Sequence, residues 1–292
     1  MNKILKLGKK RLEYLYLKKK LGSYDIAKIL KCSASHVRDS LRENSIKTRS
    51  IQEAKALTKP RYPRKNFSGN LREKAYLIGF RLGDLHISQT HPNSPTIRIS
   101  TNTTKKEQLS LFRRLFSSYG HVKAYNPDKN GAISIRCFAN RSFNFLLKKE
   151  DAVEKWILKN KALFLRFMAG YIDAEGSFCI CRNDGVFSIR SQDKNIVWTI
   201  YEELRKRNVL CKKPKMVWAG NTKNSKGLNN NKDVWALVVY RKDSLLKLIN
   251  TLNPLLKHEK RFNDMKAVES NILNRNILYN NKKDNCWYKT YT

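Results

Sequence analysis

The chain has 292 residues, 41% of them hydrophobic, and its 60 lysines and arginines face 24 aspartates and glutamates, for a net charge of +36. The hydrophobic content excludes a globally disordered chain, and the lack of any run of about 18 uncharged apolar residues excludes a membrane-spanning helix. The surplus positive charge opposes compaction unless a polyanion relieves it, which favours nucleic acid as the partner over an anionic membrane surface.

The six cysteines are scattered along the chain. Cys179 and Cys181 are the one close pair, and their spacing of two suits one face of a strand better than a zinc site. We expect free thiols and an intracellular protein, in the cytoplasm of a microbe or in an organelle.

Residues 1–57 are predicted to form an all-α domain. Apolar positions indicate helices over 10–20 and 24–30, and a further helix that Ser33 or Ser35 caps, with Val37 and Leu41 on its inner face. Two short helices joined by a tight turn, with a basic exterior, are typical of a helix-turn-helix domain that binds DNA. The alternative is a small structural helical hairpin. The candidate base-reading residues are Ser33, Ser35, His36, Arg38 and Asp39.

Residues 58–70 contain two prolines and four basic residues, so we expect a basic linker along DNA phosphates. After it, the order helix, strand pair, helix, strand pair, helix occurs twice, in residues 71–160 and 161–292. This repeat predicts an α+β fold of two pseudo-symmetric units. The second unit ends in a basic, aromatic-bearing tail.

The first helices of the two units share a pattern of small residues. The segment 77-LIGFRLGDL-85 aligns with 168-MAGYIDAEG-176, which places Gly79 and Gly83 opposite Gly170 and Ala174. Small side chains four residues apart allow a second backbone to approach closely, and an interior glycine otherwise costs a helix about 1 kcal/mol. We therefore expect these two helices to pack against each other.

An acid follows the second small residue of each helix, Asp84 in one and Glu175 in the other. Two carboxylates brought together at helix C-termini would repel each other, and a divalent cation such as Mg2+ would relieve the repulsion. Such a site can cleave phosphodiesters. The alternative is that both acids are solvated helix ends. Asp173 has no acidic counterpart, because Leu82 occupies its place, and we expect it to be a structural hydrogen-bond acceptor.

The segment 168-MAGYIDAEGSF-178 resembles the motif of the LAGLIDADG homing endonucleases, and 77-LIGFRLGDL-85 resembles a degenerate first copy. The resemblance covers residues 70–275 and implies the single-chain form: two αββαββα units whose strands make a saddle over the DNA major groove. By that pattern Asp84 and Glu175 bind two or three Mg2+ ions, with Mn2+ as a possible substitute, and both strands of double-stranded DNA are cut to leave short 3′ overhangs.

The resemblance also implies polar and basic residues around the metals. In the second unit Gln192 is the candidate amide, with Ser191 and Arg190 as alternatives, and Asn102 is its counterpart in the first unit. Lys260 is the candidate cation, with Lys257 as its neighbour. In the first unit Lys148 or Lys149 takes this place, and a solvated surface charge is the alternative for each lysine.

Sequence specificity is expected from strand residues, of which about half would face the DNA. The candidates are Arg98, Ser100, Asn102, Arg136, Arg190, Lys213, Lys215 and Arg241. Together these features predict a monomeric, metal-dependent, site-specific DNA endonuclease with a long asymmetric target. The alternatives are an intron maturase that binds intron RNA and a cleavage-inactive regulator. The first motif lacks the penultimate acid and the final glycine, which leaves a nickase open as well.

Overall fold

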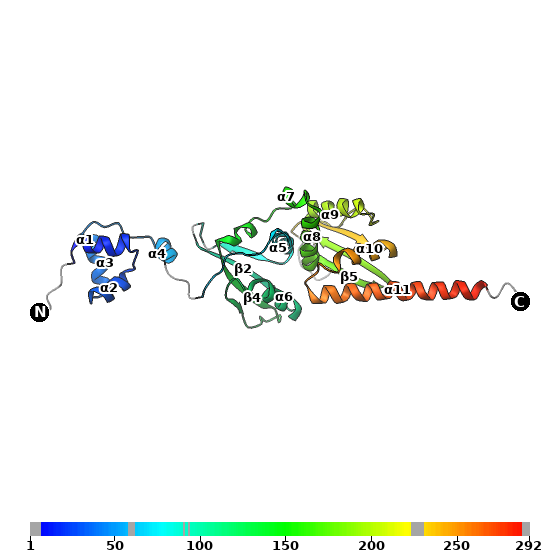
Figure 1. Cartoon of the computed structure of the whole chain (residues 1–292), viewed down its shortest axis with the longest axis horizontal. Coiled ribbons are helices and arrows are strands. Elements are labelled where there is room, and N and C mark those ends of the chain that lie inside the picture. Colours follow the sequence, from blue (N-terminus) through cyan, green and yellow to red (C-terminus); the bar gives the residue numbers. More distant parts are fainter. Residues whose placement is uncertain (1–6, 58–61, 90, 93, 223–230, 288–292) are drawn as a thin grey trace. The chain divides into compact units, whose positions relative to one another are not determined.

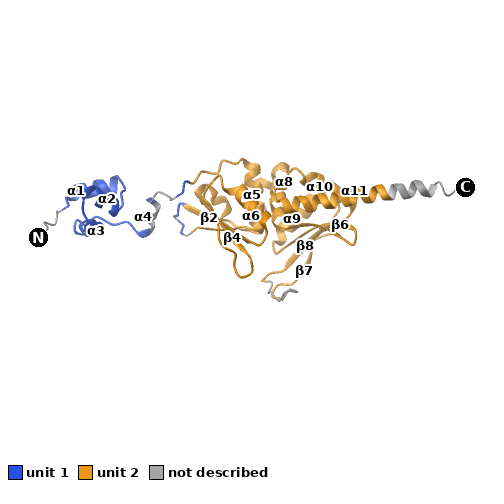
Figure 2. Ribbon diagram, turned by 90° about the horizontal axis from the view of Figure 1, so that it is seen from below, with its two compact units in different colours: residues 1–63, 90–95 blue, residues 64–89, 96–292 orange. Residues whose placement is uncertain are grey.

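A computed structural model of the chain describes residues 7–57, 62–89, 91–92, 94–222 and 231–287. The chain forms two compact units, residues 1–63 with 90–95 and residues 64–89 with 96–292 (Figure 2). Part of the expected linker, 58–61, and the last five residues of the expected tail, 288–292, lie outside the described residues. The domain boundaries expected at residues 57, 70 and 160 stay predictions.

The first unit is helical. It contains α1 (Lys9–Glu13), the π-helical turn η1 (Tyr14–Lys18), α2 (Ser23–Leu30), α3 (Ala34–Glu43) and α4 (Ile51–Leu57). Leu12, Ile26, Val37 and Leu41 form its buried core. The helix expected over 10–20 ends at residue 18 in a wider π turn, and Lys20 then takes a left-handed φ of 55°.

Arg49 ties the segment after α3 to η1 and to the turn that follows it. Its guanidinium lies 3.9 Å from the centroid of the Tyr16 ring and donates a 2.9 Å hydrogen bond to the carbonyl of Leu21. Its backbone N–H donates to the Tyr16 hydroxyl at 2.8 Å. These bonds close the unit around its small apolar core.

The second unit holds two halves with the same element order. The first half contains α5 (Leu71–Gly83), β1 (His86–Gln89), β2 (Thr96–Thr103), α6 (Lys106–Phe116), β3 (Val122–Ala124), β4 (Ile133–Asn140), the 3-10 helix η2 (Arg141–Leu146) and α7 (Lys155–Leu158). The second half contains α8 (Lys161–Glu175), β5 (Gly176–Cys181), β6 (Asp184–Ser191), α9 (Lys194–Lys206), β7 (Lys215–Trp218), β8 (Val234–Val239), α10 (Lys242–Leu252) and α11 (Glu259–Trp287).

The predicted α+β organisation with two antiparallel sheets is confirmed, with strand orders β1-β2-β4-β3 and β5-β6-β8-β7. The single helical stretch expected over 142–158 is wrong. It is divided into η2 and the short α7, because the polar segment between them buries Val153 and packs only Leu147 partly against the core. None of the helices in the described part of the chain has the length and hydropathy needed to cross a bilayer.

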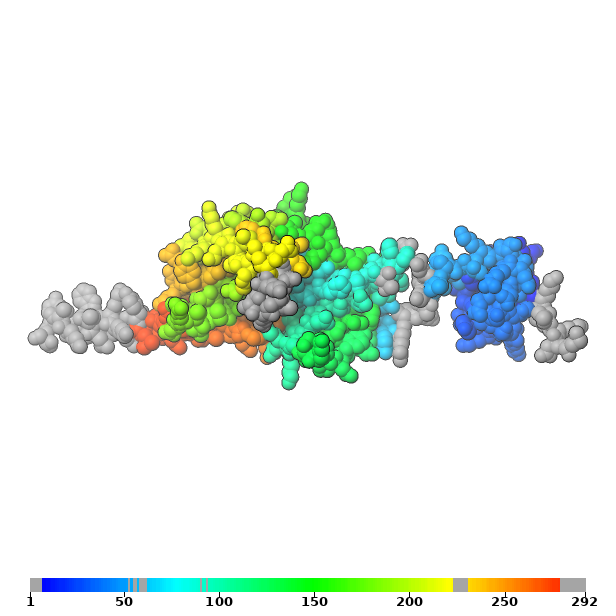
Figure 3. Space-filling model, turned by 180° about the vertical axis from the view of Figure 1, so that it is seen from behind, coloured from blue at the N-terminus to red at the C-terminus, as the bar shows by residue number. Residues whose placement is uncertain are grey.

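Alternation along the strands gives each sheet a buried and an open face. In β2 and β4, Ile97, Ile99 and Ile135 are fully buried, whereas the intervening Arg98 and Arg136 are not. Helices α6, α9 and α10 contribute side chains to the same core, and Figure 3 shows the two halves of the second unit as one continuous body. The open faces are therefore the surfaces that the sheets can offer to a partner.

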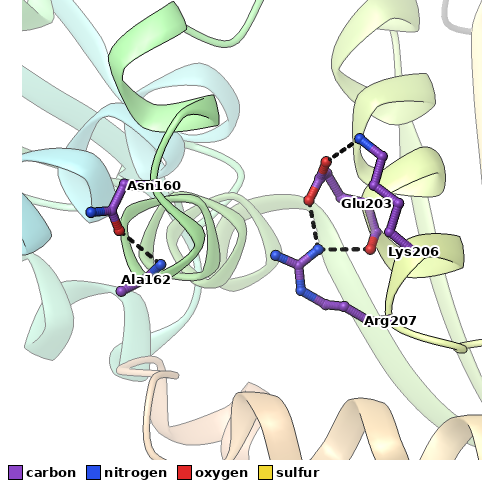
Figure 4. Close-up of polar contacts among 5 residues, drawn as sticks. All are labelled: Asn160, Ala162, Glu203, Lys206 and Arg207. Carbon is purple, nitrogen blue, oxygen red and sulfur yellow. Dashed lines mark hydrogen bonds and ion pairs between the residues drawn. The ribbon is translucent and has the colours of Figure 1, made fainter.

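Helices α5 and α8 lie side by side at the centre of the second unit (Figure 1). Asn160 caps α8 by accepting a 3.0 Å hydrogen bond from the backbone N–H of Ala162 (Figure 4) and a 3.2 Å hydrogen bond from that of Leu163. Asn70 caps α5 in the same way, at 3.0 and 3.1 Å. The matching caps start both helices in equivalent ways, as the sequence repeat suggests.

Candidate active site at two helix ends

The contact between α5 and α8 is a contact of backbones. A Cβ atom at Gly79 would overlap the carbonyl oxygen of Phe167, and one at Gly170 would overlap that of Tyr76. Because nothing larger than hydrogen fits at either position, the two glycines fix how close the helices lie.

One turn later, Gly83 faces the end of α8. A Cβ atom at Gly83 would overlap that of Ala174 and would lie 2.9 Å from Cγ and 3.2 Å from Oε1 of Glu175. The carboxylate of Glu175 therefore lies against the last turn of α5, next to Asp84, the C-terminal cap of that helix. We call Asp84 and Glu175 the acid pair.

Both carboxyl groups of the acid pair are half-buried, and both hold protons more tightly than usual. Burial raises the pKa of Asp84 to about 6. Burial, followed by the negative charges of Asp84 and Asp193, raises the pKa of Glu175 to about 7. Each acid also lies at a helix C-terminus, where the helix dipole disfavours negative charge. The two carboxylates therefore lie close together in surroundings that disfavour their ionised forms.

Few groups of the protein compensate that charge. Gln108, buried on α6, donates a 2.9 Å hydrogen bond to Oδ2 of Asp84. Arg261 and Lys149 lower the pKa of both acids, but in the described part of the chain neither acid has an ion pair within 4.0 Å. The Nε atom of Arg261 is itself buried and has no hydrogen-bond partner among the residues that the structure describes.

The donor set of the acid pair fits a hard divalent cation. Two carboxylates that repel each other, and that form no ion pair with the residues the structure describes, offer the oxygen ligands that Mg2+ prefers. Among the described residues no group of three histidine, cysteine or acidic side chains could hold a metal ion. Water and phosphate oxygens can supply the remaining ligands of such an ion, as at sites that act on phosphates.

Asp173 is a structural hydrogen-bond acceptor, which confirms the prediction from the sequence. Its side chain is 1% exposed, and its Oδ2 atom accepts hydrogen bonds from the Tyr76 hydroxyl at 2.6 Å and from the Lys257 N–H at 2.7 Å. It therefore ties α8 to α5 and to the segment before α11.

The structure does not bring two of the expected site residues to the acid pair. Gln192 is exposed, and its neighbour Asp193 instead acts on Glu175 and accepts a 3.3 Å hydrogen bond from the Tyr171 hydroxyl. Lys260 forms a 2.5 Å ion pair with Asp264, one helical turn away. The cation that acts on both acids is Arg261, the next residue.

Sequence reasoning missed Gln108, Asp193 and Arg261. Asp193 and Arg261 are each one position from the residue chosen. Lys260 and Arg261 lie in α11, where one position turns a side chain by about 100°, whereas Gln192 and Asp193 lie between β6 and α9. For Gln108 the only signal is a polar residue at a core position of α6, beside the buried Leu109 and Phe112. Lys149, one of the two alternatives in the first unit, acts on both acids, whereas Lys148 pairs with Glu150.

A hollow of about 730 Å³ adjoins Asp84 on the open face of the first sheet. It brings together four of the expected DNA-binding residues, which are Arg98, Ser100, Asn102 and Arg136. On the second sheet Arg190 and Lys215 lie on one face, because both pair with Ala236 across the strands. The expectation that Lys213 and Arg241 are strand residues is wrong. β7 begins only after Pro214, and Arg241 is the N-cap residue of α10.

In the first unit, Ser33 caps α3 by accepting a 3.1 Å hydrogen bond from the His36 N–H. Ser35 and Arg38 are exposed near the start of α3, and Val37 is fully buried. The start of α3 thus presents polar side chains to solvent.

No protein-family model and no curated protein sequence matches the chain. The similar solved structures include LAGLIDADG homing endonucleases. I-DmoI in complex with DNA and Ca is 16% identical, covers 69% of this chain and 100% of its own, and gives a TM-score of 0.48. I-WcaI bound to its DNA recognition sequence is 18% identical over 66% and 86% of the two chains, with a TM-score of 0.47. I-GzeII in complex with its DNA target is 13% identical over 77% and 98%, with a TM-score of 0.43. At such identities and TM-scores the likeness alone carries no conclusion about function.

Proposed function

We propose that this chain is a LAGLIDADG-type homing endonuclease: a monomeric, metal-dependent, site-specific enzyme that hydrolyses both strands of a long, asymmetric DNA site. One observation carries the proposal. Two acids from repeated motifs meet at the ends of two packed helices, with raised pKa values and no ion-pair partner among the described residues. The polar, basic face of a sheet lies beside them.

Within this proposal the acid pair would hold the divalent cations, two or three Mg2+ ions for which Mn2+ can substitute. When bound, such cations supply Lewis-acid stabilisation of phosphate charge and activation of water. The protein's own groups prepare the site. Gln108 orients the Asp84 carboxylate, and Arg261 and Lys149 favour the ionised form of both acids. Since cation binding requires that ionised form, these residues set the pH at which the site can load.

DNA binding is assigned to the open faces of both sheets and to the first unit. A net charge of +36 favours the approach of a phosphate backbone and makes binding salt-dependent. In the first unit Ser35, His36 and Arg38 would read bases as a helix-turn-helix, beyond the segment covered by the sheets. Two non-identical halves imply an asymmetric target.

The test is sequencing of cleavage products from a randomised duplex library incubated with Mg2+. We expect one family of asymmetric sites, cut on both strands. Absence of DNA cleavage with either Mg2+ or Mn2+, together with tight binding of structured RNA, would instead support the maturase alternative. Cutting of one strand alone would support a nickase.

A further inference from the structure

Three cations gather near the N-terminus of α5, at the end of that helix away from the acid pair. Arg72 of α5, Arg166 of α8 and Lys257 of the segment before α11 line one hollow of about 230 Å³, which we call the cation hollow. None of the three has an ion-pair partner within 4.0 Å among the described residues. Glu73 is the one acid that lines the hollow, so positive charge exceeds negative charge there.

Lys257 shows that these cations act on one another. Its side chain is half-buried, and burial lowers the pKa of its ammonium. The positive charges of Arg166 and Arg114 lower that pKa further, and the two nearby acids, Glu73 and Asp173, do not reverse the shift. Arg114 also donates a hydrogen bond to the carbonyl of Lys257. Because the cations repel one another in a partly buried position, a bound anion would stabilise all of them.

A larger hollow of about 560 Å³ adjoins the cation hollow and shares Glu73 and Lys257 with it. We call it the apolar chamber. Its aromatic and aliphatic lining residues are Phe67, Leu77, Leu115, Tyr119, Leu256 and Phe262. Arg114, Ser118 and Glu259 supply the other polar groups. Apolar walls interrupted by a small number of polar groups are typical of sites for small ligands, and the volume lies in their usual range.

The two hollows together fit a ligand that carries an anionic group beside a flat ring. Phosphate suits the cations, because arginine and lysine bind its oxygens and the N-terminus of α5 adds a favourable dipole. Aromatic side chains such as Tyr119 and Phe262 can stack on a base. The carboxylates of Glu73 and Glu259 can accept hydrogen bonds from sugar hydroxyls or base amino groups. A lipid tail would leave these polar groups without partners.

We propose that the cation hollow and the apolar chamber bind a nucleotide, with its phosphate at Arg72, Arg166 and Lys257 and its base in the chamber. The source is either a free nucleoside monophosphate or the phosphorylated end of a strand. This site goes beyond the proposed DNA cleavage, because it uses neither the acid pair nor the open faces of the sheets. Glu73 and Asp84 are separated by about 16 Å along α5.

Titration calorimetry of the full-length protein in EDTA tests the site, with the four nucleoside monophosphates, adenosine and ribose 5-phosphate as ligands. We expect a nucleotide to bind more tightly than adenosine, which lacks the phosphate, or ribose 5-phosphate, which lacks the base. Arg166→Gln and Lys257→Gln should each weaken nucleotide binding about 10-fold or more, because each removes a charged hydrogen-bond donor.

Lys161→Gln is the matched control, because it removes the same charge from an exposed position of α8 outside both hollows. It should change nucleotide binding less than about 2-fold. Equal losses in all three variants would assign binding to net charge and overturn the inference. Circular dichroism checks the folding of each variant. If Arg166→Gln does not fold, Lys257→Gln decides, since its backbone bonds to Asp173 and Arg114 are kept.

Ser118→Trp tests the apolar chamber separately, because Ser118 is an exposed lining residue and the larger ring would fill the space for the base. It should weaken binding of the nucleotide and leave binding of ribose 5-phosphate unchanged. Equal binding of the nucleotide by wild type and Ser118→Trp would contradict a base in the chamber.

Two competitors complete the test. Closed circular plasmid, which has no strand ends, should not displace the nucleotide, and displacement would place the nucleotide on a DNA-binding face instead. A 5′-phosphorylated trinucleotide that binds about 10-fold more tightly than the mononucleotides, and only with its phosphate, would identify a strand end as the source. Otherwise the source is the free nucleotide. Absence of nucleotide binding at millimolar concentration would overturn the inference, while the proposed function stands or falls on cleavage.

Discussion

Replacement of Glu175 by glutamine should stabilise the metal-free protein at alkaline pH. The glutamine keeps the shape of the side chain but removes the charge that burial and Asp84 disfavour. A pKa raised from 4.5 to about 7 corresponds, at about 1.4 kcal/mol per tenfold change in proton affinity, to about 3 kcal/mol. That is the increase in the free energy of unfolding that we expect for Glu175→Gln at pH 8.

The effect has a defined pH window. Because the folded state binds the Glu175 proton more tightly than the unfolded state, wild-type stability falls as pH rises from about 4.5 through about 7. The advantage of the variant should therefore be near zero at pH 4 and complete at pH 8. Denaturant unfolding in EDTA, followed by circular dichroism at both pH values, measures it.

Two additions make this measurement decisive. Mg2+ should stabilise the wild type at pH 8 more than the variant, because a ligand that binds only the folded state shifts the unfolding equilibrium. Glu203→Gln is the control of opposite sign. There the hydrogen bonds from Arg207 and Lys206 outweigh burial and lower the pKa, so the substitution should destabilise the protein at pH 8 (Figure 4). A Glu175→Gln protein less stable than wild type at pH 8 would refute the electrostatic reasoning.

Gly79→Ala should lower the free energy of unfolding by more than about 3 kcal/mol in a denaturant titration, because the new methyl overlaps the backbone of α8, whereas Gly8→Ala has open space and should cost less than about 1 kcal/mol. Arg261→Ala should shift the pH profile of Mg2+-dependent cleavage upward, because it removes a charge that lowers the pKa of both acids, and Lys260→Ala should not shift it. Deletion of residues 1–58 should leave a folded, cleaving core with weaker binding in a mobility-shift assay, and an insoluble product would contradict that division.

The repeated order of elements, the small residues and the two acids could be read from the sequence because each leaves a periodic signal. Gly79 and Gly170 cost helix stability unless a second backbone lies against them, so their recurrence indicates the packing that the structure contains. The positions of Asp84 and Glu175 follow from the same alignment.

The surroundings of the acid pair could not be predicted, because they depend on register between distant elements. Gln192 and Asp193 follow a strand whose end can shift by a residue, and Lys260 and Arg261 occupy the first turn of a helix where one position selects the face. No periodic pattern distinguishes the members of either pair. The division of 142–158 also depends on tertiary packing, since helix propensity alone would continue the helix.

The most direct test of the central claim is cleavage of a supercoiled plasmid that carries the selected site, by the wild type and by Asp84→Asn and Glu175→Gln proteins, in Mg2+. The account predicts linear product from the wild type, none from either variant, and target binding by both variants close to that of the wild type. Each substitution changes only one carboxylate of the acid pair to its amide, so no further variant is needed. Linear product from either variant at the wild-type rate would show that the acid pair is not the catalytic site.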